Sequence, residues 1–276
     1  MFLNVAYGYT ISNITFDSSC EIDIESNGTD GENNWAFLCL GTTLDLNGKE
    51  KLLPSGNFYN IVNYGDMKVK GTHVYNIQLG ALSAKAVCAA DDVHDQSTIT
   101  ACKNYGKIIL RDISTDVGGG SCWNGYRQIG GLVGKNMGMI ISDCENHGDI
   151  ILENIDCKTG SFYVAGIAGY NCNRLDSNAT VSTCGLIQNC RNYGAINAGQ
   201  ETPIKVYGLG LAGITGRMQW GLLDKCTNYG AINVKGVAVD SWGENSPSYK
   251  TYTNWASQIA KTTNSNAFFS VGGIFA

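Results

Sequence analysis

The chain has 276 residues, of which 16% are charged and 43% hydrophobic, and its formal net charge is −5. Scarce charge together with 35 glycines and only 3 prolines favours a regular β structure with many tight turns. The sequence has no run of Lys and Arg, which argues against a nucleic-acid partner because such a partner requires a basic stripe. No apolar run approaches the roughly 20 residues that a membrane-spanning helix needs.

Residues 1–56 match the rest of the chain weakly, so we interpret this segment as a divergent N-terminal repeat or a cap. Its first residues lack the basic and long apolar regions of a secretory signal peptide. Asp30, Glu32 and Asn33 offer oxygen ligands on a tight turn, which would suit calcium, although their spacing does not match an EF-hand. We predict a solvated turn without a cofactor, with calcium as the weaker alternative.

An Asn–aromatic–Gly motif occurs five times in residues 57–276, with successive asparagines 41, 42, 46 and 36 residues apart. Such a period is typical of solenoids and propellers, in which each unit buries its apolar face against its neighbours. The asparagines of the motif are Asn63, Asn104, Asn146, Asn192 and Asn228. In all copies but the first, a cysteine lies two residues before the asparagine; these are Cys102, Cys144, Cys190 and Cys226.

Each copy contains three short β-prone runs separated by turn residues, which we predict as three strands. Because side chains alternate along a strand, Cys144 and Asn146 share one face and Glu145 lies on the other. Other copies carry Lys, Arg or Thr in place of Glu145, so that face is exposed and the cysteine points inward. Stacked copies would form columns of thiols, asparagine amides and aromatic rings. The last residue of the motif, Gly148 in this copy, is a glycine because we expect the chain to turn a corner there, which requires either a positive φ or a close approach of two backbone segments.

Residues 130–134 read Gly-Gly-Leu-Val-Gly and are followed at close spacing by Asn136, Gly138, Ile140, Cys144 and Gly148. This pattern, which covers roughly residues 57–276, resembles the GLUG-motif repeats of large bacterial surface proteins. These include adhesin-like proteins and noncatalytic regions of IgA-type metallopeptidases. The resemblance implies an all-β, right-handed parallel β-helix in an extracellular or cell-surface setting, with about five to six repeats of about 41 residues. The alternative is a β-propeller, but a blade needs four strands and each copy supplies three.

The longest interruption of the repeats is an insertion at residues 236–268. Between Asn228 and Val271 the chain uses 43 residues where other copies use 16 to 25. Exposed aromatic side chains on such a loop are a usual means of stacking on sugars or anchoring a protein partner, although they could also pack into a small core of their own. The aromatic residues concerned are Trp242, Tyr249, Tyr252 and Trp255.

Two shorter insertions leave the repeat at one common corner. The second of them lies between Cys172 and Cys184, which could close it as a disulfide. Residues 271–276 open a further repeat, from which we expect the chain to adjoin further repeats of a longer protein. The first insertion carries Asp91, Asp92, His94 and Asp95.

The sequence contains no clear catalytic motif. A glycoside hydrolase needs two carboxyl groups about 5 to 10 Å apart. The candidates are Asp92 with Asp95, or the acids at positions 21, 23 and 25, and we interpret both sets as solvated surface side chains rather than as a catalytic pair. Only three histidines occur, without HExxH or zinc-ligand spacing, so we predict no metal site.

These observations lead us to expect a noncatalytic β-helical stalk or adhesin-like module of a bacterial cell-surface or secreted protein. Its partner would be a host or environmental glycan or a surface protein, bound through the inserted loops. The alternatives are a carbohydrate-active enzyme of the β-helix type, either a polysaccharide lyase or a glycoside hydrolase, and a segment of a phage tail spike.

Overall fold

The computed structural model describes residues 9–38, 43–44, 50–51, 56–88, 97–115, 126–175, 182–239, 268–274 and 276. Within these ranges every regular element is a β-strand, and no helix occurs. Accordingly, this part of the chain contains no helix of the length and apolarity that crossing a membrane requires. The prediction of an all-β fold is confirmed.

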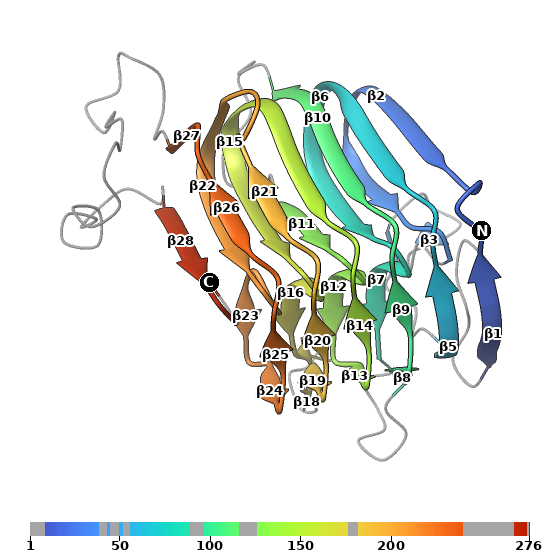
Figure 1. Cartoon of the computed structure of the whole chain (residues 1–276). Coiled ribbons are helices and arrows are strands. Elements are labelled where there is room, and N and C mark those ends of the chain that lie inside the picture. Colours follow the sequence, from blue (N-terminus) through green and yellow to red (C-terminus); the bar gives the residue numbers. More distant parts are fainter. Residues whose placement is uncertain are drawn as a thin grey trace.

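Most strands pair in parallel and belong to three sheets (Figure 1). The first sheet comprises β1 (Thr10–Phe16), β5 (Asn57–Asn63), β8 (Thr98–Thr100), β9 (Lys103–Asn104), β13 (Ile140–Ser142), β14 (Glu145–Asn146), β19 (Leu186–Gln188), β20 (Arg191–Asn192), β24 (Leu222–Asp224) and β25 (Thr227–Asn228). The second comprises β2 (Ile22–Trp35), β6 (Met67–Gly80), β10 (Ile108–Thr115), β11 (Tyr126–Gly130), β15 (Ile150–Ala165), β21 (Ile196–Ala198), β22 (Ile204–Ala212), β26 (Ile232–Val234), β27 (Val237–Val239) and β28 (Phe268–Gly272). The third comprises β7 (Ser83–Val87), β12 (Val133–Met137), β16 (Ala168–Cys172) and β23 (Met218–Gln219). Two antiparallel pairs, β3 (Thr43–Leu44) with β4 (Glu50–Lys51) and β17 (Arg174–Leu175) with β18 (Ser182–Thr183), stand apart.

Neighbouring strands come from equivalent positions of successive repeats. Asn146 pairs with Asn104 on one side and Asn192 on the other, and Ile150 pairs in the same way with Ile108 and Ile196. Successive repeats therefore add successive rungs to the sheets, which is consistent with a solenoid-like fold. A propeller is incompatible with this pairing because its blades are separate antiparallel sheets.

Two hydrophobic cores run side by side through the rungs. The long strands of the second sheet arch over at one end of the molecule (Figure 1), so that residues of both limbs, such as Ile150 and Val164 of β15, face one core. The second core lies between the first and third sheets and contains residues such as Ile141 and Leu132. Residues 129–134 and their equivalents 79–84, 164–169 and 211–216 are called the Gly-Gly motif. This motif and the Asn–aromatic–Gly corner lie where the chain passes between the two cores, since Ile129 and Ile150 belong to one core and Leu132 and Cys144 to the other.

The N-terminal segment also enters the ladders. Ile14 of β1 pairs with Ile61 of β5, and Ile22 of β2 pairs with Met67 of β6. The strands within residues 10–35 therefore extend two of the sheets by one rung, and their partly buried side chains pack against both cores.

A column of left-handed residues runs along the first sheet. These residues have φ between 50° and 56° and each directly precedes the inward Ile or Cys of its rung; they are Asn13, Asn60, Ala101, Asp143, Asn189 and Lys225. Asn and Asp tolerate this conformation, whereas an alanine there is strained by about 1 kcal/mol.

Replacing Ala101 by asparagine should therefore stabilise the protein by about 0.5 to 1 kcal/mol. The asparagine would also lie next to Asn60, which already donates to Asn13 across the preceding rung at 2.8 Å. Urea unfolding measures the change, and Asn189→Ala, the reverse exchange at an equivalent position, should cost a similar amount. An Ala101→Asn variant that is no more stable than the wild type would contradict the strain argument.

Candidate functional site

The asparagines of the repeated motif form a hydrogen-bonded column between the two cores. The side-chain amide of Asn63 donates to Asn104 at 2.8 Å, and the same contact recurs at 2.9, 2.8 and 2.8 Å up to Asn228. Each amide also donates to the carbonyl of the glycine two residues later at 2.9 Å. These hydrogen bonds link successive rungs. Every member but Asn228 is buried, so ligands cannot reach the interior of the column.

The Gly-Gly motif and the asparagine motif are contact partners in space. A Cβ atom added to Gly131 would lie 2.5 Å from Cγ of Asn146, and one added to Gly166 would lie 2.2 Å from Cγ of Asn192. The glycines of the corner are required by a different close approach, since a Cβ on Gly148 would lie 1.9 Å from the Gly106 carbonyl oxygen. Gly148 is not among the residues with positive φ, so backbone proximity is the reason for glycine there.

The cysteines of the repeat line the core of the first sheet. Cys102, Cys144 and Cys190 are buried, and Cys226 is half-buried. The Cys144 thiol donates to the Ser142 carbonyl at 3.1 Å, and burial raises its pKa. Such a thiol is protonated and unreactive. Cys172 is present as a thiol, so the disulfide with Cys184 considered for that insertion is not formed.

Changing Cys144 to serine should cost about 1 to 3 kcal/mol, because a hydroxyl is more costly to bury than a thiol. Changing Glu145 to serine should cost less than about 1 kcal/mol, because that residue makes only partly exposed ion pairs. Thermal unfolding of the two variants compares them directly. Equal losses would contradict the inward placement of the thiol.

The aromatic residues of the motif form a continuous ring stack. Centroid separations are 4.9, 4.5, 4.6 and 5.0 Å and interplanar angles are 10° to 13°. Each inner ring is covered on both faces by its neighbours, so the inner rings present their edges rather than their faces to solvent. The members are Tyr64, Tyr105, His147, Tyr193 and Tyr229.

A column of alternating charge lies beside the ring stack. The Glu145 carboxylate is 3.0 Å from both the His147 ring nitrogen and the Lys103 ammonium, and 3.4 Å from Arg191. The hydrogen bond from His147, supported by Lys103, lowers the pKa of Glu145. Opposite charges on neighbouring rungs attract each other. This attraction explains the alternating charges, so they need not be attributed to a ligand-binding site.

A buried carboxylate that the sequence did not single out holds the turn before β22. Glu153 is 1% exposed and accepts backbone hydrogen bonds from Gln200, Glu201 and Thr202 at 2.9, 3.2 and 2.7 Å. Burial favours the neutral acid, but these hydrogen bonds outweigh it and lower the pKa of Glu153.

Changing Glu153 to glutamine should cost about 2 kcal/mol at pH 7, since hydrogen bonds to a charged acceptor are lost. Because the folded-state pKa is lowered, the carboxylate stabilises the fold above the pKa of the unfolded chain, about 4.3, and this contribution is lost as the pH falls further. The difference between wild type and variant, measured by urea unfolding, should therefore shrink at acid pH. A difference independent of pH would contradict this role.

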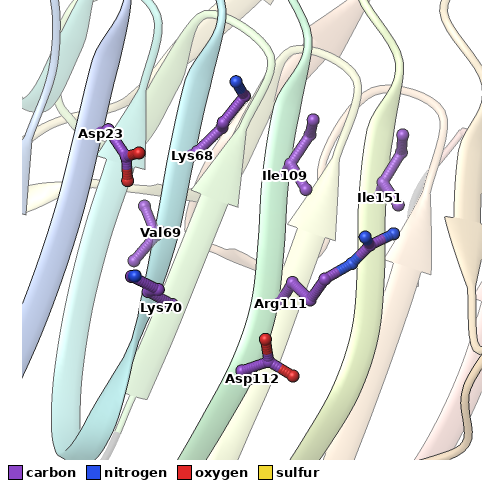
Figure 2. Close-up of a pocket in the computed structure, with 8 residues that line it drawn as sticks. All are labelled: Asp23, Lys68, Val69, Lys70, Ile109, Arg111, Asp112 and Ile151. Atoms are coloured by element: carbon purple, nitrogen blue, oxygen red, sulfur yellow. The ribbon is translucent and has the colours of Figure 1, made fainter.

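An open groove of about 240 Å³ crosses the outer face of the second sheet (Figure 2). Ile109 and Ile151 form an apolar strip, and charged side chains from β2, β6 and β10 flank it. The cations already have carboxylate partners outside the groove: Glu21 pairs with Lys68, Glu25 with Lys70, and Glu201 with Arg111. The complete lining is Asp23, Lys68, Val69, Lys70, Ile109, Arg111, Asp112 and Ile151.

The two carboxylates of the groove belong to strands that are not direct neighbours. Asp23 lies opposite Lys68, which lies opposite Ile109, three residues before Asp112. Their Cα atoms are therefore separated by two strand spacings of about 4.8 Å each and by a further shift along the strands. The acids at positions 21, 23 and 25 are all exposed. Asp23 lines the groove, and the other two pair with lysines that also line it.

Several predicted sites fall outside the described residues. Among the residues that are described, no cluster of three or more His, Cys, Asp or Glu side chains could hold a metal ion. The side chains of Asp30, Glu32 and Asn33, named for calcium, are not described, although their backbone belongs to β2. Also outside are the aromatic residues Trp242, Tyr249, Tyr252 and Trp255 and the acidic insertion with Asp91, Asp92, His94 and Asp95.

The sequence reasoning also missed a cluster of cations and tyrosines where the second and third sheets meet. Its signal was readable: the residue directly after each Gly-Gly motif is Lys85, Lys135, Tyr170 or Arg217. Comparisons of the chain with family models, with curated proteins and with solved structures find no match.

Proposed function

We propose that this chain is a noncatalytic stalk or adhesin-like module of a bacterial cell-surface or secreted protein, related to the GLUG-motif repeats. In this proposal the solenoid is a right-handed parallel β-helix of about five to six repeats. It presents binding surfaces to a host or environmental glycan or to a surface protein.

The observation that carries the proposal is that the asparagine column and the ring stack continue from repeat to repeat without a break. Amide and aromatic columns pass from residue 63 to residue 230 through every repeat of that span. Repeated contacts of this kind give a stiff, quasi-one-dimensional scaffold. A stiff scaffold is what a stalk requires, and none of the columns exposes a catalytic group.

Two places on this scaffold suit a glycan. The groove of Figure 2 combines an apolar strip at Ile109 and Ile151 with Asp23, Arg111 and Asp112 at its sides, and a sugar ring offers one apolar face and a rim of hydroxyls to such a surface. The second place is the insertion at residues 236–268, whose composition favours ring stacking.

A glycan array probed with the whole chain tests this function. Two further proteins, an Arg111→Ala variant and a chain lacking residues 236–268, separate the groove from the insertion. The matched control is Arg191→Ala, since Arg191 is also half-exposed and paired with a glutamate but lies on the first sheet. We expect binding that one of the first two changes removes and the control keeps.

Cleavage of a polysaccharide would contradict the noncatalytic assignment, above all if Asp92→Asn or Asp95→Asn abolished it. A trimer in light scattering would favour the tail-spike alternative. Failure of the whole chain to bind glycans or surface proteins would remove the adhesin-like part of the proposal.

A further inference from the structure

Three tyrosine rings surround the guanidinium group of Arg217 beside β16. The Arg217 Cζ atom lies 4.9 Å from the ring centroid of Tyr170, 5.1 Å from that of Tyr163 and 5.3 Å from that of Tyr126. Its Nη1 donates to the Tyr163 hydroxyl at 3.4 Å. The ammonium of Lys135 lies 5.5 Å from the Tyr170 centroid, so two cations share one ring.

A third cation lies on the next rung. The pairing of β7, β12 and β16 places Lys85 opposite Lys135 and Lys135 opposite Tyr170. Lys85 is only 2% exposed, and its burial, together with repulsion from Lys135, lowers its pKa to about 7. Like charges directly opposite each other on neighbouring strands are unfavourable, so this column carries an electrostatic cost.

Other charged columns of the same solenoid avoid this cost. Lys103, Glu145 and Arg191 alternate in sign along the first sheet. In the part of the chain that the structure describes, neither Lys135 nor Arg217 forms an ion pair with a carboxylate. This concentration of positive charge occurs in a chain whose net charge is −5. Local departures from a rule that the rest of a fold obeys are expected at functional or strained sites.

We propose that Lys135 and Arg217, with the hydroxyl of Tyr163, bind an oxyanion, a carboxylate or sulfate group, and that Lys85 adds positive charge behind them. Lys135 and Arg217 are half-buried and Tyr126 is 38% exposed, so the cations are partly desolvated yet open to solvent. Partial desolvation strengthens charge-assisted hydrogen bonds to an anion. The planar guanidinium fork suits an oxyanion in particular.

The oxyanion could belong to a free inorganic ion or to an acidic saccharide, and titration calorimetry on the whole chain separates the two. The probes are sodium sulfate against sodium chloride at equal ionic strength, and an oligogalacturonate against a neutral oligogalactose of the same length. We expect saturable binding of sulfate, of oligogalacturonate, or of both in competition. Sulfate alone would identify a free ion, and displacement of sulfate by the uronate would identify a saccharide.

Lys135→Gln and Arg217→Gln should each weaken this binding by about tenfold or more, since each removes one charge-assisted contact. Lys135 is half-buried and, among the described residues, contacts the Tyr170 ring without forming an ion pair, so the Lys135→Gln variant still tests the proposal if Arg217→Gln fails to fold. Arg191→Gln, which removes a cation from the first sheet, should change the affinity less than twofold. No saturable binding of either anion, unchanged affinity in Lys135→Gln, or an equal loss in Arg191→Gln would overturn the proposal. None of these outcomes bears on the stalk function, which does not depend on this site.

Discussion

Replacing Gly148 by alanine is expected to destabilise the protein by about 3 kcal/mol or more, because the new methyl group has no space. A Cβ at this position would lie 1.9 Å from the Gly106 carbonyl oxygen and 2.8 Å from the Asn104 amide nitrogen. Neither atom can move freely, since that same Gly106 carbonyl accepts the hydrogen bond of Asn104. Urea unfolding of the variant measures the loss.

Gly273 provides the matched control, because a Cβ added there meets no atom within 4 Å. Gly273→Ala should therefore change the free energy of unfolding by less than about 0.5 kcal/mol. If Gly148→Ala were as stable as Gly273→Ala, the rungs would not approach each other as closely as the structure indicates.

Replacing Asn146 by leucine should cost about 3 kcal/mol, because it strands polar groups on both neighbouring rungs. Asn146 accepts a hydrogen bond from Asn104 at 2.9 Å and donates to Gly148 at 2.9 Å and to Asn192 at 2.8 Å. Leucine has a similar volume and is apolar, so the loss reports on the hydrogen bonds rather than on a cavity.

The same change at Asn228, the last asparagine of the column, compares a terminal member with an interior one. Asn228 accepts from Asn192 and donates to Gly230, but it is only half-buried, and within the described residues its amide makes no hydrogen bond to a further rung. We expect Asn228→Leu to cost about half as much as Asn146→Leu by thermal or urea unfolding. Equal costs for the two variants would mean that the interior of the column is no more strongly coupled than its last member.

Much of the fold could be predicted from the spacing of the repeats. A strand alternates its side chains, so the different residues that replace Glu145 were enough to tell the exposed face from that of Cys144. Parallel pairing followed from repeats of nearly equal length, which stack equivalent residues on each other. The prediction of an all-β fold with mostly parallel strands is confirmed by the three sheets.

The candidate sites were harder to predict because they depend on contacts between residues distant in sequence. The groove brings together β2, β6, β10 and β15, and only the register shows that its two carboxylates, Asp23 and Asp112, lie two strands apart. In the same way, Tyr126 and Arg217 are 91 positions apart, and their contact follows from the turn between the second and third sheets.

Local patterns in the sequence were sufficient to predict which residues make up one rung. The period, the strand alternation and the turn residues specify which side chains repeat and which of them face the core, because these depend on neighbouring residues alone. Contacts between the two repeated motifs belong to the folded chain: Gly131 must lack a side chain because the Gly166 carbonyl oxygen and the Asn146 amide occupy that space. Likewise, Lys85 lies beside Lys135 only because 50 residues of chain complete one rung, and this stacking concentrates the charge.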